Sequence, residues 1–209
     1  MSASQIGVLG GTFDPPHVGH LIVARDAVDE LALDRVLLVL SARPPHRSHA
    51  DVTPAAVRWA MLEAAVADDP LLEASDLETR RPGPSYTADT LAELRRRDPA
   101  AQLVLLMGVD QWRQLESWHE PERIGHLATV AVMARAGEAA RGLGLRVPWR
   151  HCPVTRVEIS STGIRARVRA RRSIRHMVPD PVRSIIEREG LYSTLEPSVA
   201  ATGMARHVS

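Results

Sequence analysis

The sequence contains no lysine, and all 26 of its basic residues are arginine. This absence excludes a Schiff-base lysine and the lysine of a P-loop from its chemistry. The single cysteine, Cys152, cannot form a disulfide within the chain and argues against a thiolate metal site. A formal net charge of +1 gives the chain as a whole no attraction for nucleic acid.

Long apolar runs are also missing from the sequence. No stretch approaches the roughly 20 residues needed to cross a bilayer, and residues 1–5 lack the basic region of a signal peptide. We therefore expect a cytoplasmic protein that contacts no membrane. With 209 residues, 44% of them hydrophobic, the chain should form a single domain over residues 1–195. Residues 196–209 show no periodicity and are expected to be a disordered tail.

Short apolar runs alternate with helical patterns along most of the chain. Buried strands are expected at residues 6–9, 35–40, 71–76, 103–107 and 129–133, and helices at residues 19–31, 53–67 and 87–97. Thr53 and Thr87 are expected to cap the second and third helices, and residues 135–148 to form a loop. The alternation predicts an α/β fold, a Rossmann-like doubly wound parallel sheet with helices on both faces. Two more helices, one opening at 160–162 and one running from Asp180 to Gly190, predict a small C-terminal helical part from about residue 160.

The most informative segment follows the first expected strand and reads Gly10-Gly11-Thr12-Phe13-Asp14-Pro15-Pro16-His17-Val18-Gly19-His20. In open parallel sheets, ligands bind at the carboxyl ends of the strands. The glycine pair lets the backbone approach a ligand, and the following helix start offers free N–H groups to an anion. His17 and His20 can face one point and donate hydrogen bonds to phosphate oxygens. A zinc site would need a third ligand, which this spacing does not offer.

This segment resembles the (H/T)xGH signature of the nucleotidylyltransferase superfamily, in the form found in nicotinate-nucleotide adenylyltransferases. The resemblance covers roughly residues 6–192. It implies that the loop binds the phosphates of ATP and that His17 and His20 are catalytic. From the spacing of the possible ligands, we expect no dedicated metal site. The ATP contacts implied in this loop are Gly10, Gly11, Thr12, Phe13, His17, Gly19 and His20.

A second segment, Ile159-Ser160-Ser161-Thr162-Gly163-Ile164-Arg165, begins one of the expected C-terminal helices. Serine at a helix start caps free N–H groups, and an arginine one turn later can form a charge-assisted fork with a phosphate. The alternative is an ordinary cap with a surface arginine. The string is similar to the ISSTxIR motif of the family, which implies that Ile159, Ser160, Ser161 and Arg165 contact ATP and that Arg165 is catalytic. Gly163 departs from the acidic residue common there.

Three further segments resemble the acceptor side of the family: residues 41–47, residues 83–91, and Gly108-Val109-Asp110 with Trp118. In residues 41–47, Arg47 replaces the usual lysine. It keeps the positive charge but not the geometry of the lysine side chain. Residues 41–47 could instead be a proline-rich linker, and residues 83–91 a helix cap with a half-buried tyrosine. In the third segment, Trp112, Trp118 or both could be core residues. A flat pyridine ring stacks well on indole. The substrate contacts implied are Pro45, His46, Arg47, Tyr86, Thr87, Asp110 and Trp118.

The resemblance implies transfer of AMP from ATP to nicotinate mononucleotide, giving nicotinate adenine dinucleotide (deamido-NAD) and pyrophosphate in NAD biosynthesis. Mg²⁺ is expected as a cofactor that accompanies ATP, and no nucleic acid as a partner. Two alternatives stay open: the same fold acting on nicotinamide mononucleotide or phosphopantetheine, and a non-catalytic nucleotide- or RNA-binding module that uses the arginines of residues 165–175. The oligomeric state is open, a homo-oligomer included.

Overall fold

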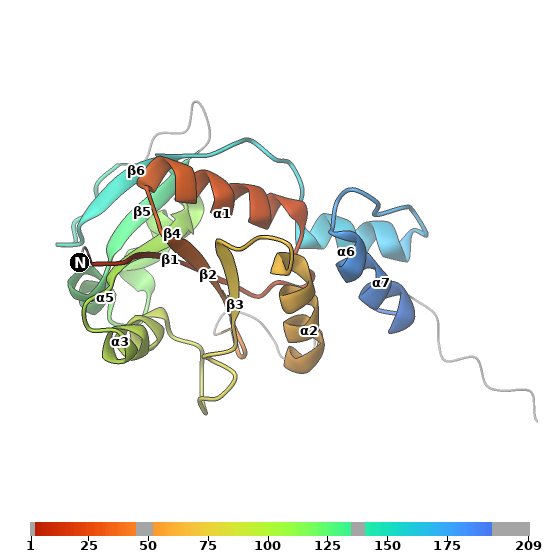
Figure 1. Cartoon of the computed structure of the whole chain (residues 1–209), viewed down its shortest axis with the longest axis horizontal. Coiled ribbons are helices and arrows are strands. Elements are labelled where there is room, and N and C mark those ends of the chain that lie inside the picture. The colour runs from red at the N-terminus through yellow and green to blue at the C-terminus, as the bar shows by residue number, and fades with distance from the viewer. Residues whose placement is uncertain (1–2, 45–51, 135–140, 194–209) are drawn as a thin grey trace, which may run out of the picture.

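The computed structural model describes residues 3–44, 52–134 and 141–193, and its elements are labelled in Figure 1. Within these residues the core is a six-stranded sheet with the order β3-β2-β1-β4-β5-β6, in which every neighbouring pair is parallel. Its strands are β1 (Gln5–Gly11), β2 (Arg35–Leu40), β3 (Leu72–Ser75), β4 (Gln102–Gly108), β5 (Thr129–Ala134) and β6 (Trp149–Pro153). The predicted α/β parallel sheet is confirmed, with β6 as an additional edge strand.

The strand order places β1 at the centre of the sheet. Val8 of β1 pairs with Leu37 of β2 on one side and with Leu105 of β4 on the other. The chain builds outward through β2 and β3, and then crosses to the other side of β1 to build β4, β5 and β6. The carboxyl ends of the adjacent strands β1 and β4 therefore mark the topological switch point, where ligands of doubly wound sheets bind.

Helices cover both faces of the sheet, because alternate strand residues point to opposite sides. Leu38 and Leu40 pack into a cluster with α1 (Val18–Leu31) and α2 (Ala55–Val66). Leu37 and Val39 pack into the opposite cluster. That second face is covered by α3 (Thr87–Arg97), α4 (Val109–Gln114), the 3-10 helix η2 (Leu115–Ser117) and α5 (Pro121–Leu127).

The last two helices pack on α2 at its side away from the sheet, as Figure 1 shows. They are α6 (Ser161–Arg169) and α7 (Asp180–Arg188). Met61 and Ala65 of α2 share an apolar cluster with Ile164 of α6 and Ile186 of α7. Helix α2 thus connects the C-terminal helices to the sheet, and the predicted C-terminal helical part is confirmed.

Two predicted helix caps are wrong. The N-cap of α2 is Pro54 and that of α3 is Tyr86, and neither side chain makes a capping hydrogen bond. Thr53 lies one residue before the cap, and its N–H donates to Asp14 Oδ2 in the loop after β1 at 3.2 Å. Thr87 is the first helical residue rather than the residue before it.

Some expectations fall on residues that the structure does not describe, namely 45–47, 135–140 and 196–209. Residues 141–148 have no helix or strand before β6, as predicted for this loop, although Val147 is buried. In the described part of the chain, no helix is long and apolar enough to cross a membrane.

Candidate active site

The two histidines of the loop after β1 lie against each other at the start of α1. Their rings stack with centroids 3.7 Å apart and an angle of 25° between the planes. His17 is the N-cap of the helix, in an extended conformation (φ −145°, ψ 166°). Its backbone N–H donates to His20 Nδ1 at 3.2 Å. Phe13 packs edge-on against His20, with ring centroids 5.0 Å apart. The predicted convergence of the two imidazoles is therefore present.

Both imidazoles are neutral near neutral pH. Burial lowers the pKa of His17 to about 4. Burial and the neighbouring charge of His17 lower the pKa of His20 to about 3. Because His20 Nδ1 accepts a hydrogen bond, the single proton of that ring belongs on Nε2, which can donate to a ligand. His17 Nδ1 is buried and has no hydrogen-bond partner among the described residues.

Gly19 allows this stacked arrangement because of its missing side chain. A Cβ at this position would lie 3.0 Å from His17 Nδ1 and 3.1 Å from His17 Cε1. Contacts this short require the imidazole to move by a few tenths of an ångström. The glycine between the two histidines therefore leaves room for the first ring over the first turn of α1.

The N-terminus of α6 binds the same loop. Ser160 caps the helix by accepting a hydrogen bond from the Gly163 N–H at 3.1 Å. The next residue, Ser161, donates its hydroxyl to the Pro15 carbonyl at 2.9 Å. Arg165 Nη1 donates to the Asp14 carbonyl at 2.7 Å. The two motifs that the sequence predicted to act together are thus joined directly, although they are about 150 residues apart.

Asp14 and Tyr192, which the sequence analysis did not select, complete this junction. The Asp14 side chain is only 2% exposed, and its Oδ1 accepts the Tyr192 hydroxyl at 2.6 Å. Burial, followed by the bond to Asp14, raises the pKa of Tyr192 far above its usual value. The phenol therefore stays protonated and remains a donor. The segment after α7 is in this way attached to the histidine loop.

A buried arginine holds the other side of the loop. Arg58 of α2 is 2% exposed and donates to main-chain carbonyls in three segments. Its Nη1 bonds the Thr12 carbonyl at 2.8 Å and the Ser41 carbonyl at 2.7 Å. Its Nε bonds the Thr53 carbonyl at 2.7 Å, and its Nη2 bonds the Ala42 carbonyl at 3.1 Å. Arg58 therefore links the loop after β1 to the loop after β2.

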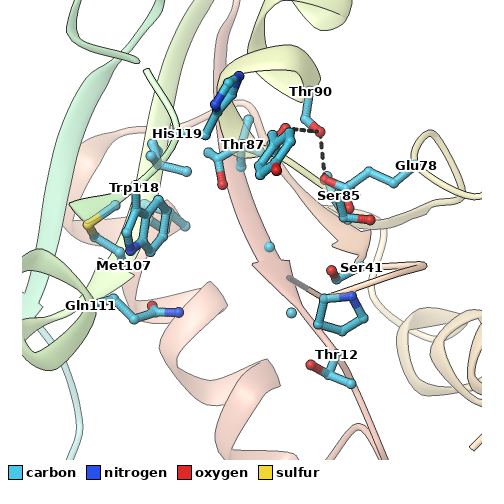
Figure 2. A pocket seen from close by; sticks show the side chains of 18 of the residues that line it. Thr12, Ser41, Glu78, Ser85, Thr87, Thr90, Met107, Gln111, Trp118 and His119 are labelled. Carbon is cyan, nitrogen blue, oxygen red and sulfur yellow. Dashed lines mark hydrogen bonds between the residues drawn. The ribbon is translucent and has the colours of Figure 1, made fainter. Parts of the chain in front are cut away.

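A cavity of about 660 Å³ opens at the carboxyl ends of β1, β2 and β4. Its size is typical of small-molecule sites. Figure 2 shows the side chains that line it, including Thr12, Ser41, Glu78, Ser85, Thr87, Thr90, Met107, Gln111, Trp118 and His119. Gly10 and Gly11 belong to its wall, so the cavity and the histidine loop share the end of β1. The side chains of His17, His20 and Arg165 do not line the cavity. The two histidines lie at the start of α1, after the loop that follows β1, and Arg165 lies on α6.

Aromatic rings form one end of this cavity. Trp118 is half-buried and lines it, whereas Trp112 is 1% exposed and belongs to the core. The Tyr86 ring stacks on His119 with centroids 4.2 Å apart and a 27° angle between the planes. Asp110 does not line the cavity: its exposed side chain pairs with Arg113 at 3.2 Å. Its predicted contact with substrate remains a prediction.

Glu78, Gln111 and His119 also line the cavity, and none of the three was predicted as a site residue. Gln111 and His119 lie next to predicted positions, and their proximity to Asp110 and Trp118 was the available signal. Glu78 lies in a segment without helical or strand periodicity, so no sequence signal identified it. The predicted residues Pro45, His46 and Arg47 lie outside the described residues, although Pro44 before them lines the cavity.

Comparison with known proteins gives consistent results. The family described as cytidylyltransferase-like matches residues 8–167. A Thermomicrobium roseum protein named probable nicotinate-nucleotide adenylyltransferase is 44% identical over 200 residues, covering 92% of this chain and 94% of that one. A Thermus thermophilus protein of the same name is 46% identical over 188 residues, covering 90% and 99%. A Plasmodium falciparum nicotinic acid mononucleotide adenylyltransferase solved with NaAD has a TM-score of 0.72 at 18% identity, covers 90% of this chain and 97% of that one, and supports the fold.

Proposed function

The chain belongs to the nicotinate-nucleotide adenylyltransferase family, and on this premise we propose that it transfers AMP from ATP to nicotinate mononucleotide. The products are nicotinate adenine dinucleotide and pyrophosphate. The observation that carries the proposal is the junction of the stacked histidines with Arg165, which reaches the Asp14 carbonyl at 2.7 Å in the same loop. The cytoplasmic location expected from the sequence is part of this proposal.

In the reaction, an oxygen of the acceptor 5′-phosphate attacks the α-phosphorus of ATP. A new P–O bond forms, the bond from the α-phosphorus to the bridging oxygen breaks, and pyrophosphate leaves with the electron pair. No protein nucleophile is needed, so the protein contributes positioning and stabilisation of charge. Mg²⁺ enters as part of the substrate, MgATP.

The residues of the loop have distinct tasks in this mechanism. His20 offers an Nε2–H donor to the phosphate oxygens, and because both histidines are neutral they donate without needing to be charged. Donors fixed in place before reaction stabilise charge that develops in the transition state. Arg165 and Ser161 place a positive charge and the N-terminus of α6 beside the same loop. We assign to them the outer phosphates of ATP.

The cavity at the carboxyl ends of β1, β2 and β4 fits the acceptor. Trp118 and Tyr86 offer faces for a pyridine ring at one end, and Gly10 and Gly11 offer close backbone approach at the other. Thr87, in the first turn of α3, also lines the cavity. The first N–H groups of a helix have no partner within the helix, and they suit the carboxylate of a nicotinate ring.

The direct test is pyrophosphate release by the purified protein with MgATP and one of three acceptors: nicotinate mononucleotide, nicotinamide mononucleotide or phosphopantetheine. We expect the highest kcat/KM with nicotinate mononucleotide, and none with phosphopantetheine, which has no ring to stack. His20→Ala serves as the catalytic control and should lower kcat about 10²-fold, the usual cost of a lost transition-state donor. Release with phosphopantetheine alone, or ATP binding without any release, would reject the proposal.

A further inference from the structure

Glu78 is a buried carboxylate on the wall of the acceptor cavity. Its residue is only 7% exposed, and it lines the cavity beside Ser85 and Tyr86. One oxygen, Oε1, accepts the Thr90 hydroxyl at 2.5 Å. The other oxygen, Oε2, is buried and has no partner among the described residues that meets hydrogen-bond geometry, although the neighbouring Ser85 hydroxyl, like that of Thr90, lowers the pKa of this carboxyl. Buried polar atoms are rarely left in this state, and an unpaired one needs a partner that arrives separately.

The surrounding network holds the carboxylate in place. The Thr90 hydroxyl also lies 3.3 Å from the Tyr86 carbonyl. Arg81 Nη2 reaches both the Tyr86 carbonyl and the Thr90 hydroxyl at 3.4 Å. Glu78 is therefore fixed to the backbone that carries the Tyr86 ring, as the dashed bonds in Figure 2 illustrate. An acceptor fixed in this way loses little entropy when a donor binds.

The position of Glu78 along the cavity indicates which part of a ligand it meets. In Figure 2 it lies between His119, at the aromatic end, and Ser41 and Thr12, at the loop end, while Trp118 of the aromatic end is on the opposite side of the cavity. A pyridine nucleotide can stack its ring at the aromatic end and direct its phosphate to the loop end. Its ribose then lies along the wall that carries Glu78. A carboxylate repels a phosphate but accepts a hydrogen bond from a sugar hydroxyl.

We propose that Glu78 Oε2 accepts a hydrogen bond from the ribose diol of the acceptor nucleotide and so selects ribonucleotides over deoxyribonucleotides. This inference rests on the proposed function. Carboxylates bind ribose hydroxyls of dinucleotides in the same way in other doubly wound folds. Burial raises the pKa of Glu78, and the bond from Thr90 is the largest effect that opposes the rise. A ribose hydroxyl that donates to Oε2 stabilises the ionised carboxylate further.

The test compares kcat/KM for nicotinate mononucleotide with kcat/KM for its 2′-deoxy and 3′-deoxy analogues. For the wild type we expect one of the two analogues to be poorer by about tenfold or more, the range for a lost hydrogen bond to a charged group. In Glu78→Gln the amide oxygen stays with the Thr90 hydroxyl, so the ribose hydroxyl can only accept a weaker, uncharged hydrogen bond from the amide N–H₂. The ribo-to-deoxy ratio should then fall to within about threefold, while the KM for ATP stays unchanged.

Glu73→Gln is the matched control, because Glu73 is an exposed glutamate on the adjacent strand β3. It should keep the wild-type ratio. A role of Glu78 in folding alone would lower kcat/KM equally for all three nucleotides and leave the ratio intact, which would overturn the inference. If Glu78→Gln does not fold, the wild-type ratios still decide: equal kcat/KM for ribo and both deoxy substrates overturns it. No turnover of nicotinate mononucleotide by the wild type would instead reject the proposed function, and this inference with it.

Discussion

Replacing Arg58 with methionine removes the guanidinium that joins the loops after β1 and β2. Methionine fills a similar volume but donates no hydrogen bond, so the carbonyls of Thr12, Ser41, Ala42 and Thr53 all lose their shared donor. The site is 2% exposed, and water does not readily replace the lost donor. We expect Arg58→Met to destabilise the fold and to lower kcat.

The magnitude follows from the number and burial of these bonds. A single hydrogen bond to a charged group contributes about 1.5–3 kcal/mol. Because all the bonds share one side chain, their energies do not add, and breaking a buried charged network typically costs about 3–5 kcal/mol. A chain of this length loses about 2–4 °C in Tm per kcal/mol. The expected fall in Tm is therefore about 6–20 °C.

Differential scanning calorimetry of Arg58→Met, Arg58→Lys and Arg188→Met measures this effect. Lysine can bond some of the four carbonyls from one point, so its Tm should lie between those of the wild type and Arg58→Met. Arg188 is an exposed arginine that pairs with Glu189, and its loss should change Tm by less than about 2 °C. An Arg58→Met protein that melts within about 2 °C of the wild type would refute the structural role assigned to this guanidinium.

Two further predictions concern the aromatic platform and the histidine pair. Trp118→Ala should mainly raise the KM for the pyridine nucleotide in steady-state assays; a rise in the KM for ATP instead would place the ring elsewhere. Stability should fall as the pH drops from about 6.5 towards 4, because the unfolded histidines take up protons at an ordinary pKa while folded His17 and His20, with a pKa of about 4 and about 3, do not. The loss is up to about 1.4 kcal/mol per pH unit for each histidine. Denaturant unfolding at pH 7 and pH 5 should show a smaller loss for His20→Gln, and an equal loss would contradict the burial of this ring.

The central strands of the sheet could be predicted because each is an apolar run buried on both faces. Strand β6 gave no such signal: of Trp149–Pro153 only Cys152 is buried, and the strand includes Arg150, His151 and a proline. Helices α4 and α5 have six and seven residues, too short for a helical period to stand out. Strands and helices were therefore predicted correctly where the apolar pattern of the sequence matches the burial of the side chains in the fold.

The residues of the site likewise fall into those that the sequence identified and those that it did not. The histidine loop and the start of α6 are continuous strings, so the sequence identified both. The roles of Glu78 and Tyr192 depend on partners distant in sequence, and no local pattern reveals them. Arg58 did leave a usable signal: its spacing from Met61, Leu62 and Ala65 places a charged side chain on the buried face of α2. A charged side chain at a core position needs hydrogen-bond partners, and those of Arg58 are main-chain carbonyls of the loops after β1 and β2 and of Thr53.

The attachment of the histidine loop to residues between Ser161 and Tyr192 bears on the order in which the site assembles during synthesis. The loop leaves the ribosome early, but the side chains that hold it are synthesised much later: Ser161 follows its partner by 146 residues and Tyr192 follows Asp14 by 178. Met177, whose carbonyl accepts the Val18 N–H at 3.0 Å, is also late. A nascent chain can therefore build most of its sheet while its phosphate-binding turn is still unsupported, and synthesis must pass Tyr192 before ATP meets an assembled site.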